Sequence, residues 1–251
     1  MANRDGSGFR SPCRVIIFDV NGTLLGYEDP LGFEKRFAQA CRDLGHPVTT
    51  DQVCLVFQRL MQEWAGSKTQ GFRRASSGEQ YRQTMTWWYQ LMLEALKVSG
   101  DLWQQADALY ERFIVQEGFM PLFGDVKDTL SRLQSRGMRL GILSNFPLHL
   151  EETLALHGIH GYFDFFVVSS VVGLEKPDPA IFELAIERAG VPKEDILYVG
   201  DTMDDDICGA RAVGLPAILI DRHDRWPKAD CVRIRSLSEL SEVAGALGFL
   251  S

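Results

Sequence analysis

The clearest indication of the fold is the stretch Val15-Ile16-Ile17-Phe18-Asp19-Val20-Asn21-Gly22-Thr23. A short run of β-branched and aromatic residues followed by Asp and then by Gly is typical of a buried strand that ends in a tight turn. The carboxylate of Asp19 is then expected at the carboxyl end of the strand, where open α/β sheets bind their ligands. This segment therefore predicts both a parallel sheet and the place of a functional site.

The rest of the chain alternates between predicted strands and predicted helices. Short apolar runs predict strands at residues 15–20, 139–144, 165–169, 196–200 and 217–221. Helical periodicity predicts helices at residues 126–136, 148–157, 179–189 and 205–213. Strands that alternate with helices indicate an α/β fold with a doubly wound, mostly parallel sheet.

One long segment interrupts this alternation. Between Gly26 and Gly118 no strand is predicted, and four amphipathic helices are expected near residues 33–44, 51–64, 79–96 and 102–117. We therefore predict a flexible tail at 1–12, an α/β core formed by 13–26 and 119–251, and an inserted helical subdomain at 27–118. The insert holds four of the five tryptophans, most of which are expected to pack between its helices while some face the sheet. These four are Trp64, Trp87, Trp88 and Trp103.

Composition excludes several classes of protein. The chain has 251 residues, 45% of them hydrophobic, and a net charge of -8, which argues against a nucleic-acid-binding protein. No apolar run approaches the roughly 18 residues of a membrane span, and the first 12 residues lack the apolar centre of a signal peptide. Five cysteines without a CxxC spacing suit a reducing compartment. We expect a cytoplasmic protein that does not bind membranes, and the sequence leaves its oligomeric state unknown.

Four short polar signals follow predicted strands. They are Asp19 with Asn21, Ser144 with Asn145, Lys176 in a Glu-Lys-Pro-Asp-Pro run, and Asp201 with Asp206. Each is weak alone, because a Ser-Asn pair is usually a turn, a Lys beside Pro is usually solvated, and acidic residues favour helix N-termini for electrostatic reasons. The carboxyl ends of neighbouring parallel strands, however, meet at one crevice. Their order and position therefore predict a single site.

The order and context of these signals resemble the four motifs of the haloacid dehalogenase (HAD) superfamily of hydrolases. The likeness covers the chain after residue 12, and the segments Leu122–Val126 and Gly209–Gly214 also resemble that superfamily. The helical segment between the first two motifs is similar to the C1 type of cap. The Trp87-Trp88 pair is similar to the REG-2-like group. The resemblance implies a Rossmann-like core and a hydrolase that acts on phosphate esters.

The resemblance also implies a nucleophile and a metal site. Asp19 is the expected nucleophile, which forms an aspartyl-phosphate. Mg²⁺ would be held by Asp19, by the main-chain carbonyl of Asn21 and by Asp201. Asp206 corresponds to a further acidic position, expected to act through water, with Asp205 as the alternative.

Other residues are expected to bind the phosphoryl group. Ser144 supplies a hydroxyl donor, and Lys176 supplies a positive charge that also orients the carboxylates. The backbone N–H groups of Val20 and Asn21 are further donors. Asn145 is expected beside them at the substrate. The implied substrate is a small phosphorylated metabolite.

Asn21 departs from the family pattern, which usually has Asp at this position. That Asp protonates the leaving group and then activates water, whereas an amide does neither. General acid–base catalysis is worth roughly 10²–10⁴-fold, so a slow enzyme is expected. The Asn21-Gly22 pair is also prone to deamidation, which would yield Asp or isoaspartate, and the sequence does not show whether Asn21 is natural or a trapping substitution.

Two other functions fit the same motifs. One is a phosphate-binding or interaction protein that has kept the fold without turnover. The other is a 2-haloacid dehalogenase, whose chemistry requires no metal; that group generally lacks the acidic metal site, so the pattern favours the phosphatase. Arg73, Arg74 and Arg82 are candidates for binding a second anionic group, although solvated faces are the ordinary place for such residues.

Overall fold

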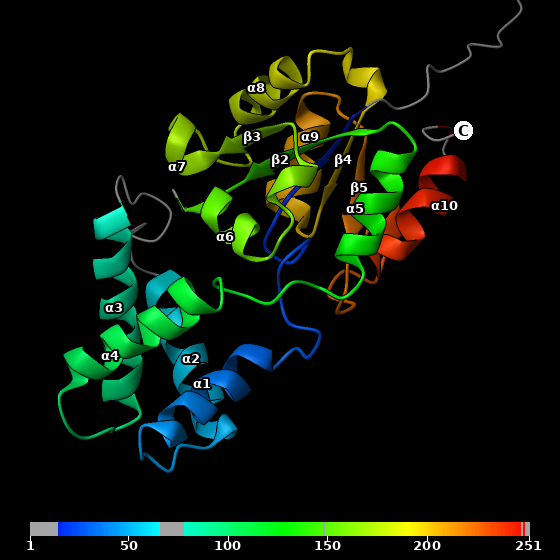
Figure 1. Ribbon diagram of the computed structural model, residues 1–251. Helices are drawn as coiled ribbons and strands as arrows, with labels where there is room; N and C mark the ends of the chain where they lie inside the picture. Colours follow the sequence, from blue (N-terminus) through cyan, green and yellow to red (C-terminus); the bar gives the residue numbers. More distant parts are fainter. Residues whose placement is uncertain (1–14, 66–77, 148, 247, 249–251) are drawn as a thin grey trace, which may run out of the picture.

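The computed structural model describes residues 15–65, 78–147, 149–246 and 248. The tail predicted at residues 1–12 lies outside the described residues. Within them, six parallel strands form one sheet in the order β3-β2-β1-β4-β5-β6, which confirms the predicted α/β fold (Figure 1). The strands are β1 (Val15–Phe18), β2 (Arg139–Ser144), β3 (Phe165–Val168), β4 (Ile196–Gly200), β5 (Ala217–Ile220) and β6 (Arg233–Ile234).

The sheet reverses its winding direction at β1. From β1 the chain passes outward to β2 and β3, and it then returns to the other side of β1 to form β4, β5 and β6. Such a reversal opens a crevice at the carboxyl ends of the strands. Phe18 lies level with Ile142 of β2 and Val199 of β4. Residues that follow these three positions therefore emerge at the same edge.

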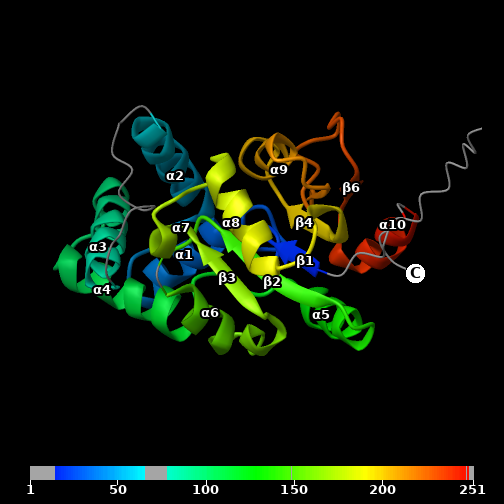
Figure 2. The ribbon, with the colours of Figure 1, turned by 90° about the horizontal axis from the view of Figure 1, so that it is seen from above.

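Helices cover both faces of the sheet because alternate residues of β1 point to opposite sides. Ile16 and Phe18 belong to a cluster with α5 (Val126–Ser135), α6 (Leu150–Leu156) and α10 (Leu240–Ala246). Val15 and Ile17 belong to a second cluster with α8 (Pro179–Ala189) and α9 (Gly209–Ala212). All four β1 residues are fully buried. Figure 2 shows α8 and α9 on one side of the strands and α5 on the other.

Between β1 and α5 the chain forms a helical insert (residues 32–116), which Figure 1 shows as a group beside the sheet. It consists of α1 (Gly32–Asp43), α2 (Thr50–Ala65), α3 (Gly78–Ala95), α4 (Leu102–Tyr110) and a π-helix (Glu111–Gln116). Apolar residues from α1, α3 and α4 form a cluster of their own, in which Phe37, Met92 and Leu93 are fully buried. The insert therefore has its own hydrophobic core. No helix among the described residues is long and apolar enough to cross a bilayer.

Two predicted helices are wrong in their internal form. The helix predicted at 102–117 is α4 followed by the π-helix Glu111–Gln116, and the helix predicted at 205–213 is a π-helix at Met203–Cys208 followed by α9. In the second case Ile207 N–H donates to Thr202 C=O, five residues back, at 3.2 Å. A change of hydrogen-bond register leaves the apolar spacing almost unchanged, so periodicity does not reveal it. Such widened turns occur often at functional sites.

Several short elements were not predicted, and some predicted ends differ. The short strand β6, the helices α7 (Ser169–Val172) and α10, and three single 3-10 turns fall below the length at which a periodic pattern is visible. The turns are His160–Tyr162, Lys193–Asp195 and Leu237–Glu239. β1, β3 and β5 end one or two residues before their predicted limits, because the chain turns at the polar residues that follow.

Candidate active site

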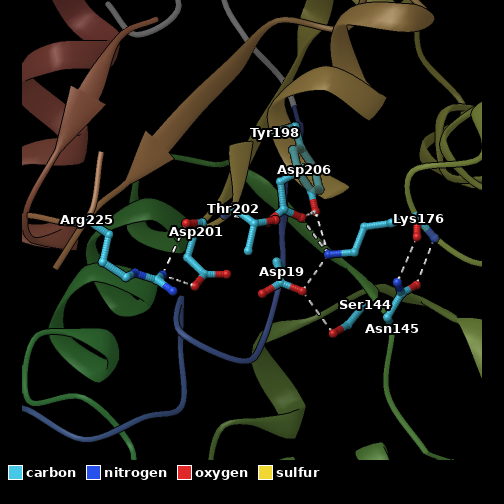
Figure 3. Close-up of polar contacts among 9 residues, drawn as sticks. All are labelled: Asp19, Ser144, Asn145, Lys176, Tyr198, Asp201, Thr202, Asp206 and Arg225. Carbon is cyan, nitrogen blue, oxygen red and sulfur yellow. Dashed lines mark hydrogen bonds and ion pairs between the residues drawn. The ribbon is translucent and has the colours of Figure 1, made fainter. Parts of the chain in front are cut away.

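Asp19 lies directly after β1 and is only 4% exposed. Its backbone N–H donates to Val199 C=O of β4 at 2.9 Å, which fixes the residue at the edge of the sheet. Its Oδ1 accepts hydrogen bonds from Ser144 Oγ at 3.0 Å and from Lys176 Nζ at 2.7 Å (Figure 3). The structure thus joins three of the predicted site residues directly.

Lys176 connects Asp19 to Asp206. Its Nζ lies 2.5 Å from Asp206 Oδ1 and 3.2 Å from Tyr198 Oη. Tyr198 also donates to Asp206 Oδ1 at 2.6 Å. Thr202 donates to Asp206 Oδ2 from its backbone N–H at 2.9 Å and from its hydroxyl at 2.8 Å. Both oxygens of Asp206 therefore accept two hydrogen bonds from the protein, so this carboxylate holds Lys176 in place.

Asn145 positions the Lys176 backbone. Its Nδ2 donates to Lys176 C=O at 3.0 Å, and its Oδ1 accepts from Lys176 N–H at 2.8 Å. The side-chain amide predicted to bind substrate is thus engaged with the chain that carries the lysine. Val20 is fully buried, and a hydrogen bond from its backbone favours the charged form of Asp19, lowering the pKa of that carboxyl. The other predicted donor, Asn21, follows it at the mouth of the site.

Asp201 follows β4 and faces the turn after β1. A Cβ added at Gly22 would lie 2.1 Å from Asp201 Oδ2, so only glycine permits this close approach. Gly22 has a φ of +80°, which also favours glycine. Arg225 Nη2 lies 2.5 Å from the same oxygen, Asp201 Oδ2. The loop carrying Arg225 is held by Asp221 at the end of β5, which accepts from Arg225 N–H at 2.7 Å.

Three buried carboxylates form a cluster that suits a divalent cation. One oxygen from each of Asp19, Asp201 and Asp206 lies within 4.8 Å of the others. The contacts described above set two cations, Lys176 and Arg225, against these three carboxylates. Oxygen ligands of this kind are those that Mg²⁺ prefers. The donor set and the remaining negative charge therefore fit such an ion.

Burial and mutual repulsion govern how these groups ionise. Burial, followed by the charges of Asp19 and Asp206, raises the pKa of Asp201 to about 7. Burial also raises the pKa of Asp19, although Lys176 acts in the opposite direction. Burial opposes the charge on Lys176 too, but the two carboxylates outweigh it and raise its pKa, so the ammonium stays protonated. For Asp206, Lys176 and the hydrogen bonds outweigh burial and lower the pKa.

A cavity of about 660 Å³ opens over this cluster. Its wall includes Asn21, Asn145, Asp205, His223 and Arg225. Asn21 is partly buried, and its Oδ1 has no hydrogen-bond donor among the described residues. An unsatisfied buried acceptor is costly. The residue lines the cavity, although this oxygen is itself shielded from solvent.

The sequence did not single out three members of this site: Tyr198, Thr202 and Arg225. Tyr198 sits within an apolar strand, where an aromatic residue is the ordinary choice, so its hydroxyl gave no signal. Thr202 follows Asp201 in the fourth motif, but the acidic residues after it were the more obvious candidates for a metal site. Arg225 lies beyond β5, and its only signal was that this strand ends at the same edge as the others.

Of the arginines considered as binders of a second anionic group, the one that the structure describes does not line the active site. Arg82 forms salt bridges with Asp107, at 2.8 Å, and with Glu111, at 2.6 Å, both on the neighbouring helical segment. Its charge is therefore neutralised within the helical insert. Arg73 and Arg74 lie outside the described residues.

Comparison with known proteins places this architecture. A parallel sheet with one Asp, a Ser, a Lys and a further pair of acidic residues at its carboxyl edge is the arrangement of a HAD-like hydrolase. The model of the haloacid dehalogenase-like hydrolase family matches residues 13–214. The chain belongs to this family.

Relatives with two different descriptions match most of the chain. A haloacid dehalogenase-like hydrolase domain-containing protein 3 of Danio rerio is 30% identical over 86% of this chain and 88% of its own length. A glyceraldehyde 3-phosphate phosphatase of Methanothermobacter thermautotrophicus is 28% identical over 92% of this chain and 99% of its own.

Solved structures of two kinds share the fold. A HAD phosphatase from Thermococcus onnurineus is 26% identical, with a TM-score of 0.59 over 92% of this chain and 98% of that one. A 2-haloacid dehalogenase from Pseudomonas syringae is also 26% identical, with a TM-score of 0.59 over 93% and 99%. Likeness of fold thus leaves the reaction to be argued from the site.

Proposed function

We propose that this chain is a Mg²⁺-dependent phosphatase that hydrolyses a small phosphorylated metabolite through an aspartyl-phosphate on Asp19. The observation that carries the proposal is the buried Asp19 carboxylate, which is held by a hydroxyl and an ammonium group and lies beside two further carboxylates. A dehalogenase of this fold requires no such acidic cluster. The names of phosphatase relatives support the same class. A cytoplasmic location remains a prediction.

In the first step a carboxylate oxygen of Asp19 attacks phosphorus as the ester P–O bond breaks. The leaving oxygen takes the bonding electron pair and then a proton, and the phosphoryl group is left on Asp19. Ser144 and Lys176, both bound to Asp19 Oδ1, would also donate hydrogen bonds to the phosphoryl oxygens. In the second step water attacks the aspartyl-phosphate, releasing inorganic phosphate and restoring the carboxylate.

The carboxylates have separate tasks in this proposal. Asp19, Asp201 and the main-chain carbonyl of Asn21 would hold the ion directly. Asp206 accepts four hydrogen bonds from Lys176, Tyr198 and Thr202, so it would act through water while it fixes the lysine. Bound Mg²⁺ supplies positive charge that lets an anionic nucleophile approach an anionic phosphoryl group. We further propose that residues 27–118 act as a cap over this edge of the sheet.

Asn21 sets the expected rate. Its amide neither donates a proton to the leaving oxygen in the first step nor takes one from water in the second. Both proton transfers are therefore left to solvent. The rate of hydrolysis should fall least for esters with acidic leaving groups, because their leaving oxygen needs little protonation. We therefore expect measurable turnover of p-nitrophenyl phosphate and much slower turnover of alkyl phosphates.

The test is phosphate release from p-nitrophenyl phosphate with Mg²⁺ and with a chelator. Asp19→Asn is expected to lower the Mg²⁺-dependent rate by at least about 10³-fold, because it removes the nucleophile. The matched control is Asp107→Asn, an acid of the helical insert that pairs with Arg82 and should leave the rate unchanged. Equal rates for Asp19→Asn and the wild type would overturn the proposal.

Two other outcomes would point to the other functions. Halide release from 2-chloropropionate in the presence of chelator would identify a dehalogenase. Binding of orthovanadate without hydrolysis of any ester would identify a phosphate-binding protein that does not turn over.

A further inference from the structure

A second cavity, of about 400 Å³, joins the active site to the helical insert. Both cavities are lined by Asn21, Tyr27, Met120 and Asn145, so they meet at the residues that border Asp19 and Lys176. The second cavity extends from this junction toward α2 and α3. Its size falls within the range of small-molecule sites. A molecule with its phosphoryl group at Asp19 therefore has this cavity open to its other end.

The walls of the second cavity are mainly apolar. The insert contributes Phe57, Met85 and Trp88, and the segment before α5 contributes Phe119 and Met120. Trp88 is only 6% exposed and Met85 5%. Among the described residues, no charged side chain lines this cavity. Of its polar lining residues, Asn21, Tyr27 and Asn145 lie at the junction, and the tyrosines Tyr81 and Tyr89 belong to the part of the wall formed by the insert.

Cations near these walls are already paired. Arg36 stacks on Phe113, a wall residue, with its guanidinium 4.7 Å from the ring centre. That guanidinium donates to Tyr27 Oη at 2.8 Å and pairs with Glu117. Arg82 is paired within the insert, as described above. An anionic group entering the cavity would lose its hydration without gaining a counter-ion, which is strongly unfavourable.

We propose that the natural substrate is a phosphate monoester whose leaving group is uncharged and apolar, an alkyl chain or an aromatic ring, and that this leaving group occupies the second cavity. The assignment of the phosphoryl end rests on the proposed function. The walls formed by the described residues disfavour substrates with a second charge on the leaving group, such as phosphoamino acids or phosphorylated carboxylic acids. The polar end of the site thus selects the phosphate, and the apolar end selects the alcohol.

The test uses phosphonates, which bind without being cleaved and are therefore independent of the missing proton donor. Calorimetry of the full chain with Mg²⁺ would compare ethyl-, butyl- and hexylphosphonate. Each buried methylene should tighten binding about fourfold, until the cavity is filled. 3-Phosphonopropionate, which matches butylphosphonate in length but carries a carboxylate, should bind at least about tenfold more weakly than butylphosphonate.

Two adjacent tryptophans on α3 provide a matched pair of variants. Trp88 lines the cavity, whereas Trp87 is 51% exposed and does not. Trp88→Ala should weaken hexylphosphonate by about tenfold and leave methylphosphonate unchanged, and Trp87→Ala should change neither. Met61→Lys, at a wall residue that is 40% exposed, is a second variant that keeps the buried core intact. It should narrow or reverse the preference for butylphosphonate over 3-phosphonopropionate.

Failure of this inference differs from failure of the phosphatase proposal. Affinity that is independent of chain length, or tighter binding of 3-phosphonopropionate than of butylphosphonate, would overturn the apolar leaving group even if p-nitrophenyl phosphate is hydrolysed. Chain-length dependence without any hydrolysis would support the apolar subsite while overturning the phosphatase. Equal effects of Trp87→Ala and Trp88→Ala on hexylphosphonate would place the subsite elsewhere.

Discussion

Asn21 stands between the nucleophile and the apolar cavity, and its chemistry limits the reaction. Its Oδ1 is a buried acceptor without a donor among the described residues. The next N–H, that of Gly22, would have to attack the Asn21 side chain during deamidation. That N–H donates to Leu25 C=O at 2.7 Å, so the fold restrains the reaction. We therefore expect position 21 to stay an amide in the folded protein.

Replacing Asn21 by Asp should restore the missing proton transfers. Asn21→Asp is expected to raise kcat for alkyl phosphates by about 10²–10⁴-fold, and to raise it far less for p-nitrophenyl phosphate, whose leaving group needs little protonation. The measurement is kcat for both esters with Mg²⁺, in wild type and variant. The pair of esters is its own control, because a general change in folding or metal binding would move both rates together. An equal gain for the two esters would contradict a role in proton transfer.

We expect that Gly22 cannot be replaced without loss of activity, because a larger residue would clash with Asp201. Gly45 serves as a comparison that has the backbone strain without the clash. Gly22→Ala adds a left-handed residue, costing about 1–2 kcal/mol, and also pushes a Cβ into the Asp201 carboxylate. Gly45 has a φ of +89° and nothing within 4 Å of an added Cβ, so Gly45→Ala carries the same backbone strain alone.

Urea unfolding and Mg²⁺-dependent hydrolysis of both glycine variants would separate the two effects. We expect Gly45→Ala to lose stability but keep activity, and Gly22→Ala to lose both. Full activity in Gly22→Ala would show that the position of Asp201 is not critical.

Among the elements, those with apolar spacing were predictable and those defined by hydrogen-bond register were not. β2, β4 and α8 match their predicted limits because buried strands and amphipathic helices display their packing in sequence. The π-helix that carries Asp206 has the apolar spacing of an ordinary helix and differs only in its hydrogen bonds. The place of the site could be predicted from polar residues at strand ends, since parallel topology gathers them, whereas the role of each residue came from the resemblance to the HAD superfamily.

The residues missed at the site show the limit of that reasoning. Tyr198 acts through a hydroxyl on a strand that any aromatic residue would suit, and Arg225 reaches Asp201 from a loop whose path is set by tertiary hydrogen bonds to Asp221. Sequence order predicts which loops meet. It does not predict which side chain of a loop turns inward.

His149, the residue before α6, links the core to α3 of the insert. His149 packs its ring against Tyr81 of α3, with ring centres 4.4 Å apart, and against Phe146. Its Nε2 is buried and has no partner among the described residues. Burial lowers the pKa of His149 from 6.5 to about 4, against the opposing charge of Glu152.

This depressed pKa predicts a loss of stability on the acidic side of neutrality. Above pH 6.5 the histidine is neutral in both states, so its contribution is fully present. Between pH 6.5 and 4 the unfolded chain takes up a proton that the folded chain does not, and the free energy of unfolding falls by on the order of 3 kcal/mol. Below about pH 4 both states are protonated and this loss ends.

His149→Phe should remove that part of the pH dependence while keeping the ring contacts. Urea unfolding at pH 7.5 and pH 5 would measure it in the wild type, in His149→Phe and in His160→Phe. His160 is a matched control, since its ring is exposed and bonded to Glu151. The same acid-side loss in His149→Phe as in the wild type would contradict the assignment.

At the scale of the whole molecule, the sheet and the insert divide the work of recognition. The carboxyl edge of the sheet supplies every charged group described at the site, because parallel strands bring Asp19, Lys176 and Asp201 to one place. The insert supplies apolar surface, because its helices bury a separate core and leave one aromatic wall toward the junction. Insert and sheet therefore face a substrate with opposite polarity.

The concentration of negative charge at the sheet edge predicts that Mg²⁺ stabilises the whole fold. An ion that binds only the folded chain at about 100 times its Kd adds about 2.7 kcal/mol, which corresponds to a rise in Tm on the order of 5 °C for a chain of this size. Thermal unfolding with Mg²⁺ and with chelator would measure the rise. The control variant Asp107→Asn, whose site lies in the helical insert and not in the carboxylate cluster, should show the same rise in Tm.

Mg²⁺ should reverse the relative stabilities of the wild type and the Asp201→Asn variant. Without metal this variant is expected to be at least as stable as the wild type, because it removes a carboxylate that burial and the charges of Asp19 and Asp206 disfavour. With Mg²⁺ the wild type gains stability and the variant gains little, because the variant lacks one of the ligands. A Tm that rises equally in both proteins would show that Mg²⁺ acts elsewhere. A variant less stable than the wild type without metal would show that the Arg225 pair outweighs the repulsion within the cluster.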